Sequence, residues 1–186
     1  GIVRGISAFF GIELSPNFNQ PYFARNFSEF WNRWHISLSH WLRDYIYYPV
    51  SRWTRRRYGK SLMLNAFVPP LITMLASGVW HNLGIYMIFW GGLHGVYQAV
   101  ERFIQQYFPP KPPSETPAWR KFVDTILVFI LTCIAWTAFG SGSFQKTLNY
   151  WQSLVSSSFI KPDLNPVTFI LPLGLVVISI LIDYGQ

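Results

Sequence analysis

The sequence has four histidines, and imidazole is well suited to accept a proton near neutral pH because its unperturbed pKa is about 6.5. They stand at positions 35, 40, 81 and 94. His81 stands out, because the Trp80-His81-Asn82 link joins two long apolar windows. Ionisable groups at the depth of a membrane are costly and usually face a cavity or a functional pathway. The position of His81 therefore favours a chemical role over a purely structural one.

His35 lies in a segment of different character, residues 26–49, which is rich in Trp and Tyr yet also contains charged side chains. Asn26 or Ser28 could cap a helix that runs to about Tyr48. At about 100° per residue, such a helix places His35 on a mainly apolar face and the charged side chains on the opposite face. The first face also holds Trp31, Leu38, Ser39, Leu42 and Ile46, whereas the second holds Arg33, Ser37, His40 and Asp44.

Other familiar kinds of site fit these residues poorly. His35 and His40 diverge by about 140° around a helix, and the sequence has no His-Glu-x-x-His motif, so no zinc site is expected. A Ser-His-Asp hydrolase is not supported, because no Gly-x-Ser-x-Gly elbow is present. The single cysteine, Cys133, excludes a disulfide framework within the chain. We therefore expect neither a metal nor a bound cofactor.

The elements that must position the histidines are predicted to lie in a membrane. The 186 residues are 51% hydrophobic and only 12% charged, against about 25% charged in soluble domains. Four windows are long enough to cross about 30 Å of hydrocarbon as helices. They are residues 62–80, 83–100, 122–140 and 166–182. The sequence therefore predicts an all-α, polytopic transmembrane bundle, the C-terminal portion of a single membrane domain from a longer protein.

Two of these windows carry residues that shape helices. Pro69 and Pro70 interrupt the first window, so a kink or break is expected there. Gly91, Gly92 and Gly95 in the second window permit close helix contact, which predicts a segment packed inside the bundle. Residues 149–159 are too short and too polar to span, and they are expected to lie at the outer interface.

The distribution of charge gives the expected orientation. The formal net charge is +7, which is compatible with nucleic-acid binding, but the basic residues crowd beside apolar windows and no nucleic-acid partner is expected. Residues 52–60 and 102–121 form the two basic segments, and both are predicted to be cytoplasmic loops, with residues 141–165 outside. The first basic loop could contact anionic membrane lipids or a cytoplasmic partner, or serve only as a topology signal.

Two long motifs carry a family resemblance. The run Phe30-Trp-Asn-Arg-Trp-His-Ile-Ser-Leu-Ser39, continued by Trp41-Leu-Arg-Asp-Tyr-Ile-Tyr-Tyr-Pro49, resembles the signature of the membrane-bound O-acyltransferase (MBOAT) family. Ser77-Gly-Val-Trp-His81, followed by Phe89-Trp-Gly-Gly-Leu-His-Gly95, resembles its second signature. The likeness is closest to the bacterial branch that acetylates polysaccharide, although Asn82 stands where bacterial members commonly have glycine.

This resemblance implies transfer of an acyl group, expected to be acetyl, from a thioester donor to hydroxyls of an extracellular polysaccharide or another cell-envelope acceptor. The donor would be acetyl-CoA or an acyl-carrier protein, and a periplasmic acetyltransferase is a further expected partner. His81 would be catalytic and His35 would assist it. The expected supporting residues are Trp80, Asn82, Trp34, Ser39, Arg43 and Asp44. The implied location is the bacterial inner membrane.

Several alternatives remain open at this level. His35 could be a structural residue beneath Trp31, His40 is expected to be solvated or interfacial, and His94 is expected to be buried and hydrogen-bonded. The chain could also be part of a transporter or channel whose pathway is formed by a helix broken at Pro69 and Pro70. A noncatalytic membrane scaffold is the third alternative.

Overall fold

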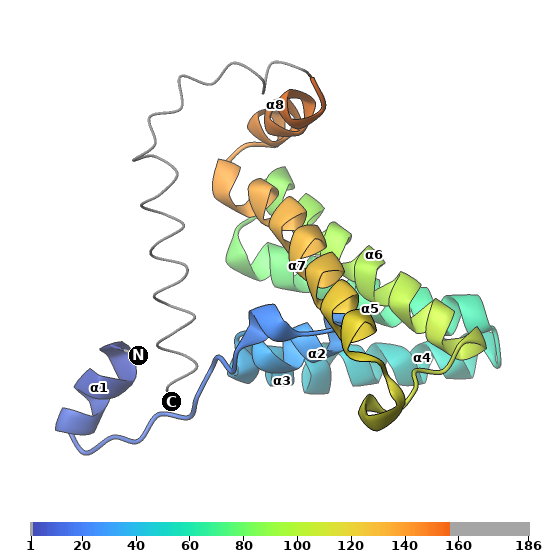
Figure 1. Ribbon diagram of the computed structural model, residues 1–186, viewed down its shortest axis with the longest axis horizontal. Coiled ribbons are helices and arrows are strands. Elements are labelled where there is room, and N and C mark those ends of the chain that lie inside the picture. The colour runs from blue at the N-terminus through green and yellow to red at the C-terminus, as the bar shows by residue number, and fades with distance from the viewer. Residues whose placement is uncertain (1, 157–186) are drawn as a thin grey trace. The chain divides into compact units, whose positions relative to one another are not determined.

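The computed structural model describes residues 2–156, and within them it contains helices and no β-strand, as Figure 1 shows. The chain divides into two units, residues 1–143 and 144–186. The first unit contains α1 (Ile2–Phe9), α2 (Phe27–Arg33), α3 (Ile36–Leu42), the π-helix η2 (Arg43–Tyr47), α4 (Tyr48–Tyr58), α5 (Leu62–His81), α6 (Ile85–Tyr107) and α7 (Ala118–Ser141). Two short 3-10 turns, η1 (Pro21–Phe23) and η3 (Pro113–Glu115), complete it. The all-α prediction is confirmed for the described part of the chain.

The described part of the second unit contains α8 (Phe144–Val155). This helix begins five residues before the polar segment that was predicted at 149–159. The fourth predicted window, residues 166–182, lies outside the described residues.

Helices α5 and α6 form a hairpin whose backbones touch because glycine occupies the contact points. A Cβ atom added to Gly91 would stand 2.3 Å from the carbonyl oxygen of Met74, and one added to Gly78 would stand 2.3 Å from that of Met87. Gly95 is nearly as restricted, because its Cβ would lie 2.9 Å from Leu71 Cα. The predicted close contact is therefore confirmed, and it fixes α6 against the helix that ends in His81.

We expect Gly91→Ala to destabilise the full-length protein by about 1–3 kcal/mol, because the new methyl group meets backbone that cannot move aside. Gly92→Ala is the matched control, since its Cβ would meet only Leu75 Cδ2, at 3.8 Å. That substitution removes a helical glycine and is expected to leave stability unchanged or slightly raised. Thermal unfolding of both variants, purified in the same detergent, measures the difference. Equal melting temperatures would contradict this account of the hairpin.

A kink or break was predicted at Pro69 and Pro70, and the helix does not break there, because α5 continues through both prolines to His81. Both prolines are buried against neighbouring helices. The two prolines lack backbone N–H groups. One turn later, the hydroxyl of Thr73 donates a hydrogen bond to the carbonyl oxygen of Pro69 (2.7 Å). The broken helix on which a transport pathway would depend is therefore absent from α5.

The single helix predicted to run to Tyr48 is wrong, because the segment breaks at Trp34 and His35. Asn26 does cap α2, since its side-chain oxygen accepts a hydrogen bond from the Glu29 amide (2.7 Å). Trp34 is extended, and His35 adopts a left-handed conformation with φ 44° and ψ 54° before α3 begins. His35 is therefore at a corner and not on a helix face.

Two asparagines from the irregular segment upstream of η1 hydrogen-bond the backbone groups that the break leaves free. The carbonyl oxygen of Asn17 accepts a hydrogen bond from the Ile36 amide (2.9 Å), and its side-chain oxygen accepts one from the Ser37 amide (2.9 Å). The Asn19 amide donates to the carbonyl oxygen of Arg33 (2.9 Å). These contacts lie outside any helical period, which is why periodicity did not reveal the corner.

A carboxylate from α6 holds the first turn of α2 in place. Glu101 accepts hydrogen bonds from the amides of Phe27 and Ser28 and from the Ser28 hydroxyl (2.8 Å). A negative charge at a helix N-terminus is favoured by the unpaired amides and by the helix dipole. Since α6 is fixed to α5 by the glycine contacts, Glu101 links the segment that carries His35 to the hairpin that carries His81.

The basic segment at 52–60, predicted to be a loop, is largely helical. Its arginines belong to α4, which ends at Tyr58 where Gly59 takes a positive φ of 59°. The charged side chains are exposed on this helix, so charge density alone was a poor guide to its backbone.

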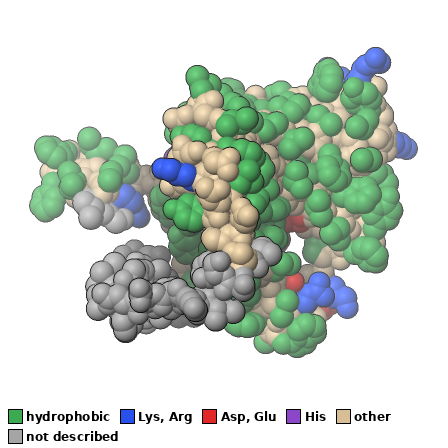
Figure 2. All heavy atoms as spheres, turned by 90° about the horizontal axis from the view of Figure 1, so that it is seen from above, with side chains coloured by type: hydrophobic (Ala, Val, Ile, Leu, Met, Phe, Trp, Pro, Cys, Tyr) green, Lys and Arg blue, Asp and Glu red, His purple; other side chains and the backbone are tan. Residues whose placement is uncertain are grey.

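Two helices among the described residues are long and apolar enough to cross a membrane, α5 and α7. Six large apolar side chains are exposed along one part of α7: Phe122, Val123, Ile126, Leu127, Phe129 and Ile130. Figure 2 shows hydrophobic side chains over much of the face in view. Apolar surface on this scale is typical of a protein that contacts lipid or further protein.

Candidate active site

His81 is the last residue of α5, and the backbone turns immediately after it. Asn82 is extended, and its amide donates to the carbonyl oxygen of Gly78 (3.1 Å). The Asn82 side-chain oxygen accepts a hydrogen bond from the Gly84 amide (2.7 Å), one residue before α6 begins. Asn82 therefore stabilises the turn that presents His81, although it does so by holding backbone and not by contacting the imidazole.

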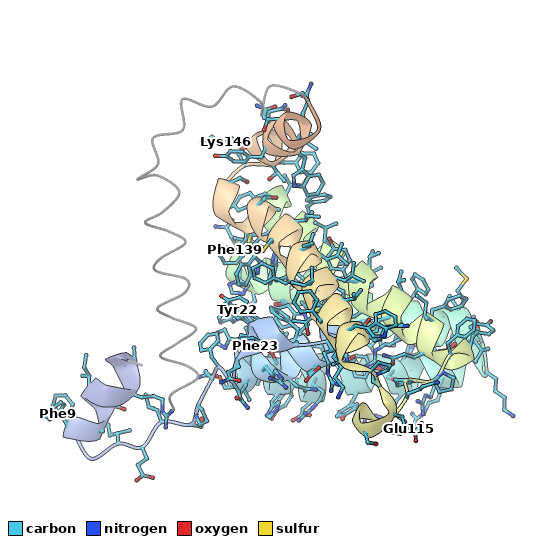
Figure 3. The ribbon with its side chains drawn as sticks, in the orientation of Figure 1. Phe9, Tyr22, Phe23, Glu115, Phe139 and Lys146 are labelled. Atoms are coloured by element: carbon cyan, nitrogen blue, oxygen red, sulfur yellow. The ribbon has the colours of Figure 1, made fainter. Side chains whose placement is uncertain are left out.

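Three aromatic rings surround the half-buried imidazole of His81. The ring centroids of Trp80, Trp90 and Phe139 lie 4.8, 5.4 and 5.2 Å from that of His81, each in an edge-to-face arrangement. Trp90 is buried in α6, and Phe139, labelled in Figure 3, comes from α7. No protein group among the described residues hydrogen-bonds the His81 ring. The site thus holds the imidazole by shape and leaves its nitrogens available to a substrate.

His35 approaches the same site from the corner between α2 and α3. Its ring centroid lies 6.2 Å from that of Trp80, edge to face, so Trp80 contacts both His35 and His81. His35 Nδ1 is buried and has no hydrogen-bond partner in the described part of the chain. The structure therefore brings together the two histidines that the sequence singled out.

His94 belongs to a different environment, an aromatic cage in the core. It is fully buried and contacts Phe27, Phe30, Trp31, Trp90 and Tyr97. The predicted burial is confirmed, but neither ring nitrogen has a hydrogen-bond partner among residues 2–156. His40 is exposed, as expected for a solvated residue.

The family model of the membrane-bound O-acyltransferases matches residues 4–141, which include both histidines and all the rings around them. The chain belongs to this family. The match therefore covers the corner, the hairpin and all of α7.

The chain is similar in sequence to three relatives from other bacteria. It is 33% identical over 152 residues to the probable alginate O-acetylase AlgI of Pseudomonas aeruginosa, which covers 82% of this chain and 27% of the relative. It is 33% identical to the peptidoglycan O-acetyltransferase of Helicobacter pylori, over 81% of this chain and 27% of the relative. It is 29% identical to the teichoic acid D-alanyltransferase of Bacillus subtilis, over 76% of this chain and 36% of the relative. The chain thus spans about a quarter to a third of the length of these relatives.

Trp34 and Ser39, which were also predicted to support the site, stabilise the corner beside His35. Trp34 stacks on Phe30 and packs against Trp136, with ring centroids 5.9 and 4.9 Å apart. The hydroxyl of Ser39 donates to the carbonyl oxygen of Trp34 (2.8 Å), which the helix break would otherwise leave without a donor. Both residues therefore fix the backbone on which His35 stands.

The last pair of expected site residues lies apart from the histidines. Arg43 Nε and Asp44 Oδ1 are 3.0 Å apart on an exposed surface, and this hydrogen bond raises the pKa of Arg43. No contact joins either side chain to His35 or His81 in the described residues. Arg43 instead lines a separate cavity.

Sequence reasoning missed three rings that contact the imidazoles. Trp90 and Phe139 pack on His81, and Phe18 lies 6.2 Å from His35. Trp90 was within the second MBOAT signature, so its motif carried the signal. Phe139 and Phe18 come from distant segments, and only the tertiary structure places them here. Within residues 2–156 no group of three metal-ligating side chains is gathered.

Proposed function

We propose that this chain carries the histidine site of a membrane-bound O-acyltransferase that transfers an acyl group from a thioester to a hydroxyl of a cell-envelope polymer. The observation that carries the proposal is the pair of imidazoles on either side of Trp80, with the His81 ring free of protein hydrogen bonds in the described part of the chain. Family membership supplies the reaction class.

In the proposed reaction, a neutral His81 accepts the proton of the acceptor hydroxyl as that oxygen attacks the thioester carbonyl carbon. A new carbon–oxygen bond forms, the carbon–sulfur bond breaks, and the thiolate leaves. The imidazolium then returns the proton to the thiolate or to water. His35 assists from the corner, where its ring can orient the acceptor or stabilise charge on His81.

The acyl group is proposed to be acetyl, because two of the three relatives are named as O-acetylating proteins. The same names point to a polysaccharide or another cell-envelope acceptor, and the third shows that the family also handles D-alanyl groups. The donor is proposed to be acetyl-CoA or an acyl-carrier protein, with a periplasmic acetyltransferase as a further partner.

We place the protein in the bacterial inner membrane, with α4 and the connection between α6 and α7 on the cytoplasmic side, because their basic residues favour that side. A cysteine introduced at position 56 should then be protected from an impermeant reagent added to intact cells. Labelling of that position from outside would overturn the orientation.

The function is tested by comparing cell-envelope polymers from cells with and without the full-length gene. Mass spectrometry should find acetyl esters on one polymer of the parent strain, and these esters should disappear on deletion and return on complementation. An unchanged ester content on every polymer fraction would contradict the proposal. D-alanyl esters in place of acetyl esters would keep the reaction class and replace the acyl group.

A further inference from the structure

His94 is a buried imidazole that the proposed reaction does not use. Its side chain has no exposed surface, and aromatic rings from α2 and α6 enclose it. A leucine or a phenylalanine would fill such a cage at lower cost, because an imidazole brings two polar nitrogens that lose their contacts with water. A polar ring in this place therefore needs a reason beyond packing.

Two indoles beside His94 are as deeply buried and share its lack of partners. Trp90 is 2% exposed and Trp31 is 8% exposed, and their ring centroids lie 5.0 and 5.2 Å from that of His94. Among the described residues, neither indole Nε1 and neither nitrogen of His94 has a hydrogen-bond partner. Buried polar groups in native proteins are nearly always hydrogen-bonded. Partners are therefore expected within this group of rings.

The three rings offer a single acceptor. An indole can only donate, whereas a neutral imidazole donates from one nitrogen and accepts at the other. Trp90 stands four residues before His94 on α6, so the helix itself holds these two side chains next to each other. The torsion that turns an imidazole about its Cβ–Cγ bond is broad. A rotation about that bond, or one bridging water, therefore brings the acceptor nitrogen to the indole N–H of Trp90.

Trp90 connects this buried pair with the candidate active site. Its ring centroid lies 5.4 Å from that of His81, with 89° between the ring planes, and 5.4 Å from that of Phe139. Edge-to-face contacts of this kind depend on the orientation of both rings. Since ring contacts hold the His81 imidazole, a change in the orientation of Trp90 changes the surface against which His81 packs.

We propose that His94 is a positioning residue for acyl transfer, whose acceptor nitrogen receives the indole N–H of Trp90 and so fixes the ring that supports His81. His94 acts through Trp90 and takes no proton from the substrate. The effect on acyl transfer rests on the proposed function, whereas the hydrogen bond between His94 and Trp90 does not.

Two substitutions at position 94 separate this role from packing. Leucine is close to histidine in volume and has no polar atom, whereas glutamine keeps an oxygen that can accept the indole N–H. Packing alone favours leucine, because burial of the glutamine amide among aromatic rings is costly. The hydrogen bond reverses this order for the rate. His94→Leu should transfer acyl groups about tenfold more slowly than the wild type, and His94→Gln should recover most of that loss.

Rates are measured on the full-length protein in phosphatidylcholine nanodiscs and normalised to the quantity of folded protein. Val128→Ala is the control for a loosened core. Val128 is buried in the same apolar cluster as Trp90, but it stands about three helical turns before Phe139 on α7. Its truncation should lower the melting temperature and leave the rate per folded molecule unchanged.

The indole proton of Trp90 gives a readout that does not depend on activity. In protein with isotopically labelled tryptophan, NMR identifies this resonance by its loss in Trp90→Phe. A hydrogen bond deshields the donated proton, so the resonance should move upfield in His94→Leu and stay near its wild-type position in His94→Gln. If His94→Leu does not insert, the wild-type resonance decides alone, because a Trp90 proton at the position of a free indole overturns the pair.

A rate for His94→Leu that equals the wild type, or exceeds that of His94→Gln, would overturn the positioning role. A shift of the Trp31 resonance in place of that of Trp90 would overturn the proposed pair. The two proposals fail separately. Transfer that is indifferent to position 94 removes the role of His94 and leaves the function. A Trp90 resonance that depends on His94, in a protein that transfers no acyl group, removes the function and leaves the hydrogen bond.

Discussion

Full-length protein with His81→Gln is expected to insert into the membrane in normal amount and to transfer acyl groups at least about 10²-fold more slowly than the wild type. The reason is chemical. Glutamine can form hydrogen bonds and has a comparable polar end, but its amide does not accept a proton at neutral pH. The surrounding rings of Trp80, Trp90 and Phe139 would still pack on the shorter polar group.

The measurement is initial-rate transfer of a radiolabelled acyl group to the polymer, normalised to the quantity of folded protein in the membrane. A structural histidine would behave in the opposite way, because a lost packing contact lowers yield and leaves the specific activity of the surviving protein intact. His40→Gln is the matched control, since that side chain is exposed and outside the cluster. Near wild-type specific activity of His81→Gln would remove His81 from the mechanism.

Replacement of His35 by glycine is expected to separate activity from stability. Its left-handed backbone, with φ 44°, costs an ordinary residue about 1–2 kcal/mol, whereas glycine adopts it freely but loses more entropy on folding. These two backbone terms nearly cancel, so only the lost contacts of the His35 ring with Trp80 and Phe18 should lower the melting temperature. Loss of the imidazole beside Trp80 should nevertheless lower the transfer rate about tenfold or more.

Gln20→Gly is the control for the backbone, because Gln20 also has a positive φ, of 46°. It should retain the wild-type rate. The pH dependence of transfer gives a second readout, since a positioning role for His35 changes the profile of His81 whereas a packing role does not. Full activity of His35→Gly with an unchanged profile would show that His35 serves only the corner.

Local patterns predicted those features that depend on neighbouring residues. The Asn26 cap and the glycine contacts of α6 are set by short spacings, and both are present. His35 was assigned correctly to the region of His81, but from motif resemblance and with the wrong backbone. Its corner depends on Asn17, whose hydrogen bonds reach across 20 residues to Ser37. A helical projection assumes that the helix continues without a break, so it could not predict the corner that Asn17 stabilises.

Charge density was misleading about backbone structure. The arginines at 52–57 predicted a basic loop, yet they belong to α4. Arg52 and Arg55 line a cavity, and Arg56 and Arg57 do not. Nothing in their spacing distinguished Arg55 from Arg56, because the other walls of that cavity come from helices distant in the sequence.

The hydrogen bonds between Glu101 and the first turn of α2 also determine when this part of the site can form during synthesis of the chain. Ser28 leaves the ribosome 73 residues before Glu101, its hydrogen-bond acceptor. At about 5–20 residues per second, several seconds separate the two. During that interval the first amides of α2 donate hydrogen bonds to water or to lipid headgroups. The corner that carries His35 then has no fixed position relative to the hairpin. The two imidazoles can therefore meet only after α6 has been synthesised and inserted, which makes assembly of this site a late, post-insertion event.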